Sequence, residues 1–118
     1  MSAAASIADD TNHVAATVYY PDSGGVSLDE RSFFLLGITA DDCTVSVEVS
    51  MDGTYWVDIT DLAVEDIESG GLGGPVVFAA ATSVIWIAWV MPAELARLKV
   101  VYPDATNQFS ATISRRSL

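Results

Sequence analysis

Carboxylates are the most abundant side chains in this sequence that could do chemistry. The 118 residues include sixteen Asp and Glu, and one group is denser than the rest: Asp58, Asp61, Glu65, Asp66 and Glu68. Clustered carboxylate oxygens suit Ca²⁺, but the EF-hand order D-x-[DN]-x-[DN]-G is absent. A carboxylate pair can also hydrolyse glycosides, yet nothing here singles out one carboxyl with a raised pKa. The sequence therefore predicts no metal site and no catalytic acid or base.

The other reactive side chains are a single cysteine and a single histidine. Asp41 and Asp42 precede Cys43, and their negative charges oppose formation of the thiolate. One cysteine makes no internal disulfide, and with His13 it cannot complete a structural zinc site. The glycines of residues 70–74 are followed by no lysine, so they do not form a P-loop, and no G-x-S-x-G occurs. We predict a non-enzymatic chain with no cofactor and a reduced thiol, as in the cytosol.

Charge is strongly negative and unevenly distributed. The formal net charge is −11 at pH 7. Nucleic-acid binding needs Lys and Arg to displace counterions, and anionic membranes attract basic segments, so neither partner is expected. Residues 1–96 hold fifteen acidic side chains against Arg31 alone. The basic side chains of residues 97–118, set against Asp104 alone, are Arg97, Lys99, Arg115 and Arg116. This basic end could meet an acidic partner or a second copy of the chain.

No targeting or membrane segment is expected. Residues 1–16 lack a basic region followed by an apolar core, so they do not read as a signal peptide. Residues 76–92 are apolar but fall short of the roughly 20 residues that a spanning helix needs. We expect residues 1–13 to form an extended arm outside the fold.

Short runs of β-branched and aromatic residues, separated by Gly, Pro, Asp and Asn, predict strands. The predicted strands cover residues 14–20, 27–36, 44–50, 54–60, 76–80, 83–91, 96–102 and 108–114. A single helical turn is possible from Pro92 to Leu95. The fold class that follows is an all-β antiparallel sandwich, jelly-roll or Ig-like, over residues 14–118.

The clearest hairpin lies between residues 45 and 60, where Val45, Val47 and Val49 alternate with polar residues. Asp52-Gly53 is a strong turn signal, since glycine readily takes positive φ. In the return strand we expect Val57 and Ile59 to face inward. Trp56 then either covers its own sheet and turn or anchors a partner.

The run SVIWIAWVM, Ser83 to Met91, has no polar face. Trp86 and Trp89 lie on opposite sides of this strand, so one is expected in the core and the other outside. A strand of a sandwich needs only one apolar face. Self-association is the explanation we favour; a loop or the N-terminal arm folding over the outer face is the other. The predicted interface residues are Trp86, Trp89, Trp56, Arg97, Arg115 and Arg116.

The segment VSVEVSMDGTYWVDIT resembles a hairpin pattern, V-x-V-E-x-S-x-D-G-x-x-W, of small β-sandwich capsid decoration (cement) proteins of bacteriophages. The segment ARLKVVYPDATNQFSATISRR is similar to their usual ending. The resemblance implies a virion structural protein, assembled in the host cytoplasm, that sits on the capsid exterior. It would bridge subunits of the major capsid protein as a homo-oligomer, a trimer being favoured. Carbohydrate-binding modules carry similar hairpins. The alternative is therefore a glycan-binding module of a phage tail or fibre, with Tyr55 and Trp56 as a stacking platform.

Overall fold

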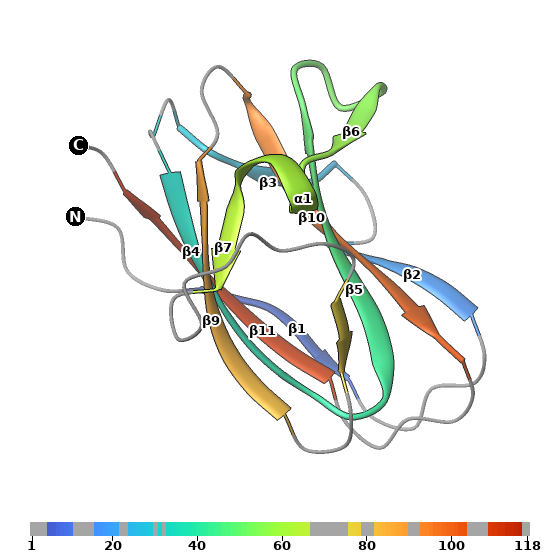
Figure 1. Ribbon diagram of the computed structural model, residues 1–118. Coiled ribbons are helices and arrows are strands. Elements are labelled where there is room, and N and C mark those ends of the chain that lie inside the picture. The colour runs from blue at the N-terminus through green and yellow to red at the C-terminus, as the bar shows by residue number, and fades with distance from the viewer. Residues whose placement is uncertain are drawn as a thin grey trace.

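The computed structural model describes residues 5–10, 16–21, 24–29, 31, 33–66, 76–78, 82–89, 93–103 and 109–116. Strands account for most of these residues, and they form two antiparallel sheets that pack against each other (Figure 1). This arrangement confirms the predicted all-β antiparallel sandwich. Among the described residues the one helix is a single turn, α1 (Thr60–Ala63).

The five-stranded sheet contains the first and last of the described strands. Its order is β1 (Ala5–Asp10), β11 (Phe109–Arg116), β4 (Phe33–Ala40), β9 (Thr82–Trp89) and β7 (Val64–Asp66). Strand β4 at its centre alternates strictly between half-buried and buried residues. Such alternation, with period two, places every second side chain of a strand in the core.

The six-stranded sheet is built around β10. Its order is β2 (Ala16–Tyr20), β10 (Leu95–Tyr102), β5 (Cys43–Ser50) and β6 (Trp56–Asp58). Two short strands extend it: β3 (Val26–Ser27) pairs with β10, and β8 (Val76–Phe78) pairs with β5.

The core fills the space between the two sheets with alternate side chains from each. Its largest fully buried members are Trp86, Tyr102, Phe34, Phe109, Leu28, Leu36, Ile38, Leu98, Val45, Val47, Val64 and Val100. An aromatic group ties the sheets together. Phe109 stacks on Tyr20 at 5.3 Å between ring centroids and meets the edge of Tyr102 at 6.3 Å. The two tyrosine hydroxyls are 2.8 Å apart, within hydrogen-bonding distance.

The chain changes sheets through a buried threonine. Thr60 follows β6 and opens α1, which leads to β7 in the other sheet. Its Oγ1 accepts a hydrogen bond from the Val47 N–H (2.7 Å) and donates to Asp58 Oδ1 (2.6 Å). The hydroxyl thus replaces a backbone acceptor where β6 stops pairing with β5, so that the Val47 N–H stays satisfied.

Replacing this hydroxyl by a methyl group should be costly. Thr60→Val keeps the shape of the side chain but leaves the buried Val47 N–H without this acceptor, at a cost of about 1–3 kcal/mol. Thr60→Ser keeps the hydroxyl and should lose much less. The measurement is the free energy of unfolding from urea titrations of the two variants. Equal losses in both variants would contradict this account of Thr60.

Several details differ from the sequence predictions. The strand predicted at 54–60 is limited to β6, Thr60 opens α1 instead, and β7 was not predicted. The strand predicted at 27–36 is two strands, because Leu28 leaves β3 and buries itself while its N–H donates to Glu94 O (2.8 Å). The helical turn predicted near Pro92 does not extend to Leu95, which begins β10. Residues 5–10, assigned to an arm outside the sandwich, form β1 and pair with β11. Without β1, β11 would be an edge strand with unpaired backbone groups. Ala8 of β1 is buried in the core.

Candidate functional site

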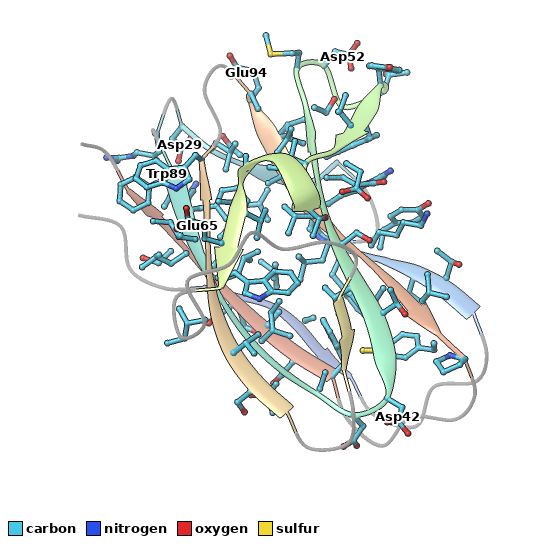
Figure 2. The ribbon with its side chains drawn as sticks, viewed as in Figure 1. Asp29, Asp42, Asp52, Glu65, Trp89 and Glu94 are labelled. Carbon is cyan, nitrogen blue, oxygen red and sulfur yellow. The ribbon has the colours of Figure 1, made fainter. Side chains whose placement is uncertain are left out.

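The most unusual surface is the outer side of the five-stranded sheet, where β4 and β9 carry adjacent apolar side chains. We call it the apolar face; it consists of Phe33, Leu35, Ile85, Ile87 and Trp89. In the ladder Phe33 is opposite Trp89, and Leu35 is opposite Ile87. The Phe33 and Trp89 rings lie 5.1 Å apart. Ile85 is 49% exposed and Trp89 is 44% exposed. Figure 2 shows the Trp89 ring pointing away from the second sheet.

The inner side of β9 faces the core. Trp86 and Ala88 are fully buried there. The two tryptophans therefore lie on opposite sides of the strand, Trp86 inside and Trp89 on the surface, as the alternation predicted. That Trp89 lies at a seam between subunits stays a prediction.

The apolar face gives way to hydroxyl groups along the same strands. Thr39 Oγ1 and Ser83 Oγ lie 3.0 Å apart across β4 and β9. Beside them Gly37 forms the floor of a shallow hollow of about 350 Å³, whose rim includes Thr112 and Ile85. A Cβ at Gly37 would come within 3.0 Å of Thr112 Oγ1, so the glycine keeps the sheet surface low here. One sheet face thus offers an apolar half and a polar half.

Arg97 lies on the outer side of the six-stranded sheet, between two aromatic rings. Its guanidinium carbon is 4.0 Å from the centroid of Tyr19 and 4.1 Å from that of Trp56. Its Nε donates to Glu48 Oε1 at 2.8 Å. Stacking on two rings and pairing with a carboxylate both favour a fixed guanidinium. Arg97 therefore makes its polar contacts within the chain.

Trp56 covers its own turn. Its Nε1 donates to Gly53 O at 3.2 Å, and its ring edge occupies the space where a Cβ of Gly25 would lie. Tyr55 beside it is 73% exposed. The Trp56 ring is thus held against Arg97, whereas the neighbouring Tyr55 ring projects from the turn.

Arg115 is also engaged within the chain. Its Nη1 donates to Asp29 Oδ2 and to Ser27 O, so β11 is linked to the turn after β3. Arg116 ends β11, and its side chain lies outside the described part of the structure. Two basic residues predicted to meet a partner, Arg97 and Arg115, are therefore already paired within the chain, with Glu48 and Asp29.

Cys43 begins β5 and is buried. Burial, together with the charges of Asp42 and then Asp41, raises the pKa of its thiol from 9.0 to about 11. The sequence predicted the direction from the two aspartates; burial is the larger cause. The thiol is therefore protonated and poorly nucleophilic near neutral pH.

Metal ligands do not come together in the part of the chain that the structure describes: no three His, Cys, Asp or Glu side chains there could hold an ion. His13 and the glycines of residues 70–74 lie outside the described residues. No described helix is long and apolar enough to cross a membrane. Searches of family models, curated proteins and solved structures found no match to this chain.

Sequence reasoning missed two features. The Arg97 stack joins residues from β2, β10 and β6, and only the sheet order brings them together. The second is a groove at one end of the sandwich, described below, where Val57 points toward the space between the sheets yet stays exposed. The run from Met51 to Tyr55 gave the one available signal, since two large apolar residues flank a turn there.

Proposed function

We propose that this chain is a non-enzymatic structural protein that decorates the outside of a phage capsid and bridges its major capsid subunits. It would act as a homo-oligomer, a trimer being favoured, on the virion after assembly in the host cytoplasm. The virion assignment comes from the resemblance of the hairpin and the last strands. The observation that carries the assembly role is the apolar face.

The apolar face has the composition of an interface centre. It offers two aromatic rings and three aliphatic side chains on neighbouring strands. Interface centres are poor in charge and rich in aromatic residues. Each Å² of apolar surface removed from water contributes about 25 cal/mol, and specific interfaces bury about 800 Å² per partner. The face is therefore a suitable nucleus for an interface that the surrounding hydroxyl residues complete.

Acidic charge limits where copies can meet. Two chains of net charge −11 repel each other over most of their surface. The apolar face carries no charged side chain of its own, and its charged ladder neighbours are Glu65, opposite Ile87 on β7, and Arg116, opposite Phe33 on β11. Association through this face keeps most carboxylates apart, so it should be insensitive to salt.

Ile85→Asp should convert the oligomer into a monomer. The new carboxylate would lie on the apolar face, at its border with the hydroxyl groups, where association would bury it without a partner. Ile85 is half exposed in the single chain, so the fold should tolerate the change. Light scattering coupled to gel filtration, at micromolar concentration in high salt, measures the mass.

Val101→Asp is the matched control, since Val101 is exposed on the outer side of the other sheet. It should leave the oligomer intact. A wild-type chain that is monomeric under these conditions would overturn the assembly role. Electron microscopy of particles with and without the added protein tests separately whether the protein binds the outside of the capsid.

A glycan-binding module of a tail or fibre is the alternative. The exposed Tyr55 ring supports it, because sugars stack on aromatic faces. The position of Trp56, between its own turn and Arg97, weakens it.

A further inference from the structure

A second apolar surface lies at one end of the sandwich and meets the face proposed for assembly at Trp89. A groove of about 480 Å³ opens there between the β5–β6 turn, the residues around α1, and the start of β10. Its apolar lining comes mainly from Val49, Met51, Tyr55, Val57, Ile59 and Ala63. We call it the turn groove.

The turn groove exists because the sandwich is open at this end. Val57 is opposite Val49 in the β5–β6 ladder, so both point toward the space between the sheets. Val49 packs against the core, whereas Val57 stays 41% exposed. Met51 and Tyr55 beside it are 60% and 73% exposed. Three large apolar side chains thus border one hollow that is open to solvent.

The turn that carries Met51 and Tyr55 is held by its own side chains. Asp52 Oδ1 accepts hydrogen bonds from the N–H groups of Thr54 and Tyr55, each at 2.9 Å. Ser50 Oγ accepts from the Gly53 N–H at 2.8 Å and from the Asp52 N–H at 3.2 Å. Because these bonds fix the backbone before any partner arrives, binding here costs less conformational entropy.

Charge around the turn groove is negative. Asp52 lines it, and the bonds from Tyr55 and Thr54 lower the pKa of this carboxyl, so it stays ionised. The Glu94 N–H donates to Ser50 O, which places the exposed Glu94 beside the groove. Figure 2 shows Asp52 and Glu94 at the same end of the molecule. No Lys or Arg is among the described residues that line it.

We propose that the turn groove binds an extended peptide segment of a partner protein, in which a large apolar residue is flanked by Lys or Arg. The apolar side chain would enter between Val57 and Met51, and the basic neighbours would face Asp52 and Glu94. A second copy of this chain fits less well, since Arg97 and Arg115 already pair with Glu48 and Asp29. The turn groove shares Trp89 with the apolar face. The side chains expected to contact the peptide, Val57, Met51, Asp52 and Glu94, lie outside that face, so the proposal does not depend on the assembly role.

Selection from a randomised dodecapeptide library on the full chain tests the proposal. Wild type should enrich peptides with a large apolar residue beside Lys or Arg. Val57→Lys places a positive charge in the turn groove and should reduce enrichment of that pool about tenfold or more. Val101→Lys adds the same charge on an exposed strand position elsewhere and should leave enrichment unchanged. The most enriched sequence, made as a labelled peptide, should bind more weakly as salt is added.

The proposal would be overturned by no enrichment on wild type, by equal enrichment on Val57→Lys, or by an enriched pool without basic residues. Thermal melting of both lysine variants checks that each is folded. Val57→Lys that changes the oligomeric state would instead identify a second copy as the occupant and would also refute the peptide. Ile85→Asp should bind the labelled peptide as wild type does. The oligomer mass therefore tests the assembly role, and peptide binding tests the turn groove, independently of each other.

Discussion

Val47→Asp is expected to leave the domain unfolded. Val47 is fully buried in β5, at the centre of the six-stranded sheet. Its N–H bonds to Thr60 Oγ1 and its carbonyl accepts from the Ile59 N–H at 3.0 Å, so the strand cannot rotate the new side chain outward. An unpaired buried carboxylate costs several kcal/mol, against a total stability of about 5–15 kcal/mol.

Far-ultraviolet circular dichroism and amide proton dispersion by NMR are the measurements for Val47→Asp. Val101→Asp is the control, because the same residue is introduced on β10 at a position that is 37% exposed. It should fold as wild type does. A Val47→Asp chain with dispersed amide signals and a cooperative melt would show that the inner face of β5 has been assigned wrongly.

The second large effect concerns alkaline pH and Cys43. The folded-state pKa of this thiol, about 11, is above its unfolded value of 9.0. The unfolded chain therefore loses the proton first, and stability present below pH 9.0 is lost as the pH rises toward 11. Two pH units of difference correspond to about 3 kcal/mol. Wild type should become markedly less stable over this range.

Cys43→Ala separates this effect from the titration of Lys and Tyr side chains. The variant loses the thiol, so its stability should fall less over the same pH range, whatever constant cost the smaller side chain brings. Urea titrations of both proteins at the two ends of the range give the comparison. Parallel pH dependences would show that the thiol is not the titrating group.

Much of the fold could be predicted because its strands carry local signals. Alternation in β5 and the Asp52-Gly53 turn identify one hairpin without any knowledge of the rest. The apolar run around Trp86 and Trp89 identified β9 and the opposite directions of its two tryptophans. These features depend on residues that are neighbours in sequence, and period two is a property of the strand itself.

The parts that were missed depend on contacts between distant segments. Leu28 leaves its strand because its N–H donates to Glu94 O. The local sequence around Leu28 gives no sign of this distant contact. Val57 has the inward direction expected for it but stays exposed, because the end of the sandwich is open at that point. The sequence suggested that the charge of Arg97 is available to a partner. In the structure, its cross-strand neighbours Tyr19, Trp56 and Glu48 surround it. The sequence thus predicts which side of a strand a side chain points to. It does not predict which residues of other strands that side chain contacts.

The pairing of β1 with β11 has a consequence for how the molecule comes to be folded. Ala5 lies opposite Ile113, and β4 takes its neighbours β11 and β9 from much later in the chain. A growing polypeptide on the ribosome cannot complete this sheet until β11 has been made. Until then β4 and β9 expose their apolar residues, and ordering them must wait for the closure of a long loop. Folding of the five-stranded sheet therefore cannot finish before β11 is available, and the acidic charge, present from the first strands onward, keeps unfinished chains apart in the meantime.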